Sequence, residues 1–159
     1  LFQRYSQALL EYLNQAALPE SIAQAIDYMK GVYDIMWDYR FLFSDVNTLL
    51  IRSSELLGQH NDFTRARVSP LLLKLLTQMQ ESGMIAIDER AKQDLAVNMW
   101  LLTKYWFDFD SSMQGRAKIT AAAKKRGVYQ TLSLLRPYLQ DKHIAEFEAC
   151  ATKLSRIAD

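Results

Sequence analysis

The chain has 159 residues, half of them hydrophobic, with only 5 Gly, 3 Pro and a formal net charge of +1. This length suits one domain with a real core, and the scarcity of Gly and Pro argues against a fold rich in strands and tight turns. The balanced charge gives no electrostatic basis for nucleic-acid binding, the single Cys150 excludes an internal disulfide framework, and no apolar stretch reaches the roughly 18 residues of a membrane span.

Hydrophobic periodicity predicts helices through the first third of the chain. The first covers residues 1–17. Pro19 opens the second, because Pro is tolerated in a first helical turn, and Gly31 is expected to break or bend that helix. Residues 32–53 then form a long helix that is apolar on two faces, which indicates burial by several neighbours.

The remaining helices are predicted from their caps. Ser54 caps the next one. Residues 58–61 are a possible interruption, Pro70 is expected to kink the helix or begin its second half, and Gly83 ends it. Helices over 88–112 and 119–139 follow, with Lys124, Lys125 and Arg126 facing solvent, and Asp141 caps the last helix. The predicted fold class is therefore all-α, a bundle of six or seven helices.

The chemistry of metal and cofactor sites is missing from the sequence. Neither His60 nor His143 follows a Glu at the spacing of a di-iron helix bundle, and two His with one Cys make a zinc site improbable. No Gly-rich phosphate loop or nucleophile elbow occurs. We therefore expect no metal, no cofactor and no catalytic residue, and hence no enzyme.

Two segments, 33–43 and 98–109, are aromatic nearly all round their helices. Large rings with a few polar groups are typical of a small-molecule pocket, but they are equally typical of a plain core. The predicted ligand-binding residues are Tyr33, Trp37, Phe41, Asn98, Tyr105 and Trp106. Asn98 lies among apolar neighbours, so it should bond a neighbouring helix or face a ligand. Asp45 and Arg52, two turns apart, are expected to form a buried ion pair or, less simply, to offer a ligand a carboxylate.

Several of these segments resemble a known family. Residues 39–52 read YRFLFSDVNTLLIR, which looks like a helix that reads Tyr-Arg-Phe-Phe-x-Arg-Asp-Leu, then Leu-Leu, then Arg, in certain TetR-family regulators. Residues 96–106 resemble the next long helix of these regulators, and residues 127–139 resemble the helix after it. Residues 1–13 are similar to the helix directly after their DNA-binding unit, so the resemblance covers nearly the whole chain.

The resemblance implies that residues 1–159 form a single regulatory domain, all-helical and similar to a TetR C-terminal domain. The DNA-binding helix-turn-helix domain is then missing upstream. In this family two late helices pair with the same helices of a second subunit, and a small molecule in the core shifts the spacing of the DNA-binding heads of the repressor. We accordingly expect a cytoplasmic homodimer that binds an apolar or aromatic effector, contacts DNA only through the absent domain, and binds no membrane.

The sequences of the late helices partly support a dimer independently of this resemblance. Helices 88–112 and 119–139 are apolar on more than one face, and such helices need a partner. The candidates for the dimer interface are Trp100, Tyr105, Val128, Leu132 and Leu135, each of which could instead pack within the subunit. One alternative is a homodimeric interaction module without a ligand pocket. Another is a lipid- or cofactor-handling enzyme that uses Asp34, Asp38 and Asp108, although a solvated helix face explains these carboxylates more simply.

Overall fold

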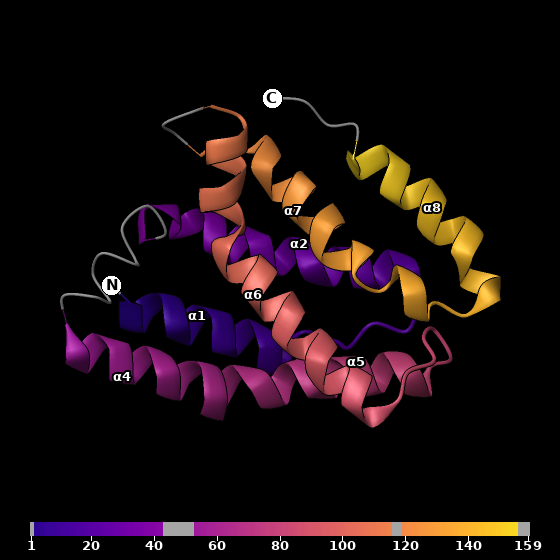
Figure 1. The fold of residues 1–159 in the computed structure, drawn as a ribbon, viewed down its shortest axis with the longest axis horizontal. Coiled ribbons are helices and arrows are strands. Elements are labelled where there is room, and N and C mark those ends of the chain that lie inside the picture. Colours follow the sequence, from indigo (N-terminus) through magenta and orange to yellow (C-terminus); the bar gives the residue numbers. More distant parts are fainter. Residues whose placement is uncertain (1, 43–52, 116–118, 156–159) are drawn as a thin grey trace.

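The computed structural model describes residues 2–42, 53–115 and 119–155 (Figure 1). Within these ranges every regular element is a helix, so the prediction of an all-α fold is confirmed. The α-helices are α1 (Phe2–Gln15), α2 (Ile22–Asp38), α4 (Ser54–Asp62), α5 (Ser69–Glu81), α6 (Glu89–Met113), α7 (Ala122–Ser133) and α8 (Asp141–Ser155). Two 3₁₀ turns, η1 (Arg40–Leu42) and η3 (Arg136–Tyr138), and a π-helix, η2 (Phe63–Val68), complete the described elements.

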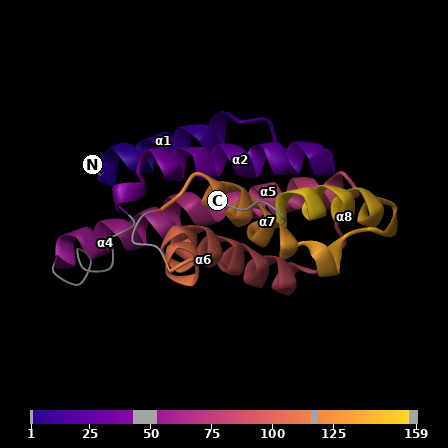
Figure 2. The ribbon, with the colours of Figure 1, turned by 90° about the horizontal axis from the view of Figure 1, so that it is seen from above.

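The helices are arranged so that α7 is surrounded by others. It contacts α2, α6 and α8, while α1 packs on α2 and α5 packs on α6. In Figure 1, α4 and α5 run nearly end to end along one side of the bundle and α6 crosses in front of it, whereas Figure 2 shows α1 and α2 on the opposite side from α6. Among the described helices, none covers the outer face of α6, where Val97 and Leu101 are exposed (Figure 2).

Caps fix the start and end of several helices. The Ser21 hydroxyl accepts a hydrogen bond from the Gln24 N–H at 3.2 Å, and the Asp88 carboxylate accepts one from the Ala91 N–H at 2.8 Å, which satisfies otherwise orphaned donors at the starts of α2 and α6. Gly83, just after α5, has a φ of 79°. This left-handed conformation suits glycine, so the predicted end of that helix is confirmed.

The prediction of a break at Gly31 is wrong, because α2 runs through it. The glycine is needed there for close packing. A Cβ at position 31 would overlap the ring of Tyr12 on α1, and the Tyr12 hydroxyl donates a hydrogen bond to the Tyr28 carbonyl at 2.7 Å. Helix α2 instead ends at Asp38. The rest of the predicted helix 32–53, including the Asp45–Arg52 pair, lies largely outside the described residues.

Pro70 is accommodated by a π-helix. Residues 54–62 form an uninterrupted α4, so the expected interruption after Gly58 does not occur. The chain then widens in η2, where the Ser69 N–H donates to the Thr64 carbonyl, five residues back. Pro70 follows in the first turn of α5, where its missing N–H costs least. The prediction that Pro70 begins a second half of the helix is thus confirmed.

The predicted helix over 119–139 is shorter than expected. Helix α7 ends at Ser133, and Pro137 lies in the 3₁₀ turn η3 that follows. This turn is held against the loop between α5 and α6. The Ala86 N–H donates to the Tyr138 carbonyl at 2.8 Å, and the Gln140 N–H donates to the Met84 carbonyl at 3.0 Å. The α7–α8 connection is therefore tied to the loop that joins α5 to α6.

Candidate ligand site and partner surface

Aromatic side chains fill the part of the core around Tyr33 and Trp106, where the aromatic segments were expected to line a pocket. Tyr33 is fully buried, its ring packs edge-on against Phe107 with centroids 5.9 Å apart, and its hydroxyl shares a hydrogen bond of 2.8 Å with the Thr131 hydroxyl. Burial raises the pKa of Tyr33 well above its ordinary value. Trp106 is also buried and donates from Nε1 to the Ala123 carbonyl at 2.8 Å. Both polar tips are satisfied inside the core.

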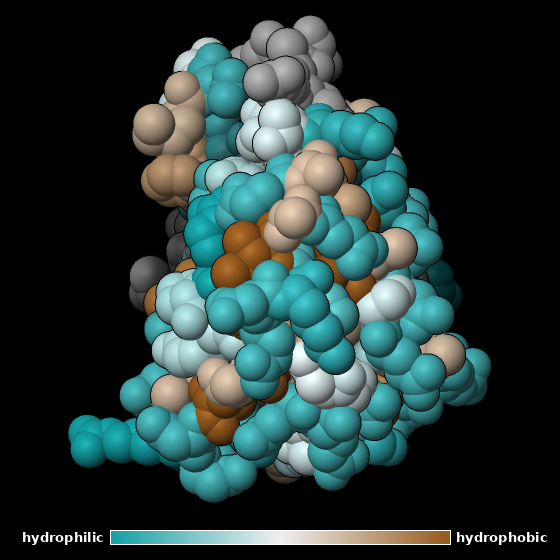
Figure 3. All heavy atoms as spheres, turned by 90° about the vertical axis from the view of Figure 1, so that its right-hand side faces the viewer, coloured by the Kyte–Doolittle hydropathy of each residue, from teal (hydrophilic) through white to brown (hydrophobic). Residues whose placement is uncertain are grey.

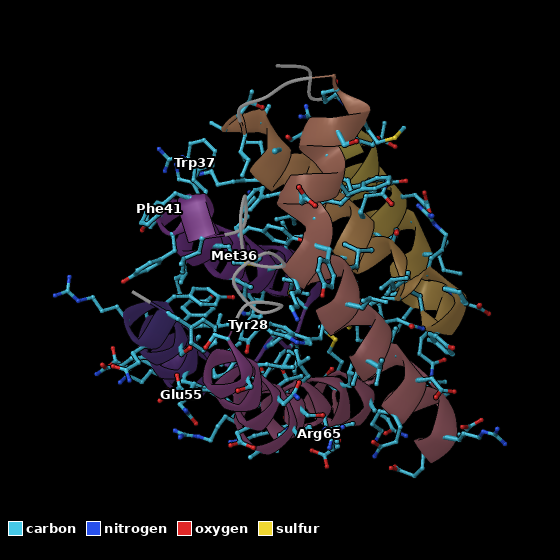
Figure 4. All side chains as sticks on the ribbon, turned by 60° about the vertical axis from the view of Figure 1, so that its left-hand side comes forward. Tyr28, Met36, Trp37, Phe41, Glu55 and Arg65 are labelled. Carbon is cyan, nitrogen blue, oxygen red and sulfur yellow. The ribbon has the colours of Figure 1, made fainter. Side chains whose placement is uncertain are left out.

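Trp37 lies near the end of α2, and Phe41 lies just after that helix, in η1. The Arg40 guanidinium stacks over the Trp37 ring, 4.3 Å from its centroid, and Phe41 is 55% exposed. Figure 4 shows both residues well away from Arg65 on η2. Trp37 nevertheless packs edge-on against Phe107 of α6, with ring centroids 6.3 Å apart, so it shares this contact with Tyr33.

The two remaining candidates, Asn98 and Tyr105, both lie on α6 but differ in their surroundings. Asn98 is exposed, so its expected burial among apolar side chains is wrong, and it bonds no neighbouring helix in the described residues. Tyr105 is half-buried and lines a groove between η2, the start of α5, and α6. The six predicted residues thus do not form one pocket, and only Tyr105 lies in an open concavity of this kind.

This groove, called the α6 groove below, has a volume of about 280 Å³. It is lined by Asn61, Thr64, Arg65, Ser69, Leu72, Ala96, Val97, Trp100, Leu101, Lys104 and Tyr105. Two of the lining residues, Thr64 and Trp100, each carry a buried side-chain atom, Oγ1 and Nε1 respectively, that has no hydrogen-bond partner among the described residues. Sequence reasoning did not single out Thr64 or Arg65, because no local pattern tells whether a hydroxyl will be left unpaired.

Two other concavities are less suited to a ligand. A larger groove of about 670 Å³ runs between α1 and the α4–η2 segment, but it is wide open and lined largely by polar side chains of α1. A void of about 20 Å³ lies at the centre of the bundle, between apolar side chains and Thr103, and it is just large enough for a water molecule. Leu72 and Trp100 separate this central void from the α6 groove, since both line the two spaces.

Three of the five proposed interface residues face inward. Val128, Leu132 and Leu135 are 1–3% exposed, because α7 is covered by α2, α6 and α8. Their burial within the subunit offers a partner no surface and argues against the interface role assigned to them. Of the other two, Trp100 packs edge-on against Phe63 with centroids 6.2 Å apart, and both Trp100 and Tyr105 line the α6 groove.

A different set of apolar residues is exposed on α6. Val97, Leu101, Phe109 and Met113 are 54–68% exposed, and together with the half-buried Tyr105 they follow each other at intervals of four residues. This spacing makes them successive neighbours in a row that winds partly round the helix, called the α6 stripe below. The end of the molecule shown in Figure 3 is by contrast mostly hydrophilic, with only small hydrophobic areas.

Some of the charged groups that sequence analysis singled out form ion pairs. Arg126 was expected to face solvent, but it forms a two-pronged ion pair with Asp110 at 2.8 Å, and both side chains are largely buried. Lys124 pairs with Asp34 at 3.0 Å near the surface. Asp38 and Asp108 are exposed. These positions give a solvated face and structural ion pairs, with no cluster of carboxylates around a cavity.

Two further features are absent from the described ranges. No group of three or more His, Cys, Asp or Glu side chains there could hold a metal ion. None of the helices described has the length and apolar character needed to cross a membrane.

Comparisons with known proteins agree with one another. The sequence matches the family model for TetR, described as a bacterial transcriptional repressor, over residues 4–147. The fold is similar to the crystal structure of a TetR-family transcriptional regulator from Marinobacter aquaeolei VT8, with a TM-score of 0.79 and 25% sequence identity. That similarity covers 96% of this chain and 73% of the Marinobacter chain. No curated protein matches the sequence.

Proposed function

The chain belongs to the TetR family of bacterial transcriptional repressors, and on that basis we propose that it is the regulatory domain of a homodimeric, effector-responsive regulator. In this proposal a separate helix-turn-helix domain contacts DNA in the cytoplasm. A small effector bound by residues 1–159 changes the spacing of the two DNA-binding heads. The effector can do so only if it binds the two spacings with different affinity.

The α6 stripe is the observation that carries the dimer. Single exposed apolar residues are ordinary on a monomer, but a contiguous apolar strip along one helix is typical of an interaction surface. A second copy of the same chain supplies the same strip, and an isologous contact about a two-fold axis would bury both at once. The family relationship favours this occupant over an unrelated protein. We therefore assign the dimer contact to Val97, Leu101, Phe109 and Met113 rather than to the buried residues of α7.

The test is the solution mass of the chain, measured by light scattering during size-exclusion chromatography. One chain has a mass of 18.4 kDa, and we expect twice that. Phe109→Glu places a charge in the α6 stripe, outside the α6 groove, and should give a monomer with unchanged helicity by circular dichroism. Ile144→Glu makes the same kind of change at an exposed apolar residue of α8 and should remain dimeric. A monomeric wild type, or a Phe109→Glu protein that stays dimeric, contradicts the assignment.

A second function remains open, namely a dimeric interaction module that binds no effector. The filled core around Tyr33 and Trp106 favours it, because Tyr33 and Phe107 occupy the place where the sequence suggested a pocket. The α6 groove, with its unpaired polar atoms, favours an effector instead. Both functions predict the same mass, so they are separated by ligand binding rather than by oligomeric state.

A further inference from the structure

We propose that the α6 groove is the effector site and that it takes a small amphipathic anion, a carboxylate attached to an apolar body. The proposal rests on the proposed function only in calling this ligand an effector. Binding itself follows from the groove and can be measured on this chain without DNA.

The size of the groove sets the size of the ligand. Its volume of about 280 Å³ lies just below the usual range of small-molecule pockets, about 300–1,000 Å³. Liquid water occupies about 30 Å³ per molecule, so the space holds a compound of roughly ten heavy atoms. One aromatic ring with a short acidic side chain is of this size.

The unpaired polar atoms indicate that the ligand must offer hydrogen-bond acceptors. Trp100 Nε1 can only donate a hydrogen bond, and the Thr64 hydroxyl can donate one as well. Both atoms are buried without a described partner, and a buried donor that lacks an acceptor costs free energy. Phe63 packs edge-on against the Trp100 ring. A ligand oxygen that accepts from these two donors would remove the cost.

The charges around the groove point to an anion. Its lining includes the cations Arg65 and Lys104 and no carboxylate. Neither cation forms an ion pair with a described residue, in contrast to Lys124 and Arg126, whose charges are matched by Asp34 and Asp110. Lys104 Nζ lies 5.0 Å from the centre of the Tyr105 ring, on the same wall. An acidic ligand is therefore the species whose charge this groove matches.

The rest of the lining suits the apolar part of the ligand. Leu72 and Ala96 provide a hydrocarbon surface beside the polar atoms. Val97 and Leu101 also line the groove and belong to the α6 stripe, so a bound ligand would lie beside the assigned dimer contact. The opposite wall is the π-helix η2, and such widened turns are frequent at functional sites because they displace side chains from regular helical positions. In η2 the widened turn contains Thr64 and Arg65, both of which line the groove.

The experiment is calorimetric titration of the whole chain with phenylbutyrate and with its neutral analogue phenylbutanol. We expect saturable binding of phenylbutyrate at one site per chain and at least tenfold weaker binding of phenylbutanol. Trp100→Phe keeps an aromatic ring but removes the N–H donor, and it should weaken phenylbutyrate binding about tenfold, as expected for one hydrogen bond to a charged group. Lys104→Gln should weaken phenylbutyrate binding and leave phenylbutanol binding unchanged.

Matched controls distinguish the groove from general surface charge. Arg67→Gln changes a neighbouring cation of η2 that lines the other groove, and Lys125→Gln changes an exposed lysine of α7. Both should bind phenylbutyrate as the wild type does. The proposal is overturned by absent or non-saturable binding of phenylbutyrate, by equal affinity for phenylbutanol, or by wild-type affinity in both Trp100→Phe and Lys104→Gln. In that case ordered water would be what satisfies Thr64 and Trp100.

The two proposals can fail separately. A dimer that does not bind phenylbutyrate removes the effector site and leaves the dimeric regulator. A monomer that binds it with the expected variant profile keeps the site and removes the assigned dimer contact.

Discussion

At the scale of single residues, two glycines show how closely α7 is packed. A Cβ at Gly127 would lie 2.5 Å from the Tyr33 ring and 2.6 Å from the Trp106 ring, whereas a Cβ at Gly58 in α4 would meet nothing within 4 Å. Gly127 is thus the point where α7 approaches both predicted aromatic segments, and the missing side chain lets these rings occupy the core.

These glycines give opposite predictions for the same substitution. Gly127→Ala should destabilise the fold by about 1–3 kcal/mol, because overpacking a filled core outweighs the better helix propensity of Ala. Gly58→Ala should stabilise it by up to about 1 kcal/mol, because only propensity changes. Chemical denaturation followed by circular dichroism measures both. Equal effects of the two substitutions would show that Tyr33 and Trp106 yield to the added methyl group.

At the scale of elements, the Asp110–Arg126 pair fixes α7 on α6. The two side chains are 5% and 14% exposed and joined by two hydrogen bonds of 2.8 Å. The Asp34–Lys124 pair joins α2 to α7 with one contact of 3.0 Å, and its side chains are 62% and 28% exposed. Burial and geometry therefore distinguish a strong link from a weak one on the same helix.

A double-mutant cycle on each pair measures this difference. Asp110→Ala should cost about 3–5 kcal/mol of stability, because it leaves Arg126 largely buried without its carboxylate. The coupling between Asp110→Ala and Arg126→Ala should be about 1–3 kcal/mol. The coupling between Asp34→Ala and Lys124→Ala should stay below about 1 kcal/mol, as for exposed pairs. Additive effects at Asp110 and Arg126 would contradict the structural role of the pair.

Periodicity and caps predicted most helices but could not tell which neighbour covers each face. The starts at Ser54 and Asp88 and the end at Gly83 are local signals, and the structure bears them out. Gly31 was misjudged because its reason is Tyr12, on another helix. Leu132 has the spacing of an apolar face, but whether another helix or a second chain covers that face depends on the tertiary arrangement. The groove escaped prediction for the same reason.

At the scale of the whole molecule, buried tyrosines tie stability to pH. Burial raises the pKa of Tyr5, Tyr28 and Tyr33 well above the ordinary value of about 10. These residues come from α1 and α2 and face different parts of the core. In the folded chain they remain protonated at pH values where the unfolded chain ionises them.

The sign of the resulting pH dependence follows from linkage. Below a pH of about 10 both states hold these protons and stability does not depend on them. Above it the unfolded state binds fewer protons, so the free energy of unfolding should fall by about 1.4 kcal/mol per pH unit for each buried tyrosine. Urea denaturation at increasing pH measures this slope. Tyr33→Phe should make it shallower by the contribution of one tyrosine, about 1.4 kcal/mol per pH unit. An unchanged slope in that variant would show that Tyr33 ionises without unfolding.

The placement of the methionines has a consequence for oxidative chemistry. Five of the six, Met29, Met36, Met79, Met84 and Met99, are 0–3% exposed, while Met113 is 68% exposed and belongs to the α6 stripe. A peroxide in solution would therefore reach one thioether long before the others. Its product, a polar sulfoxide, would lie in the apolar surface assigned to the second copy and leave the core intact. In this molecule, oxidative damage and loss of subunit contact would begin at the same side chain.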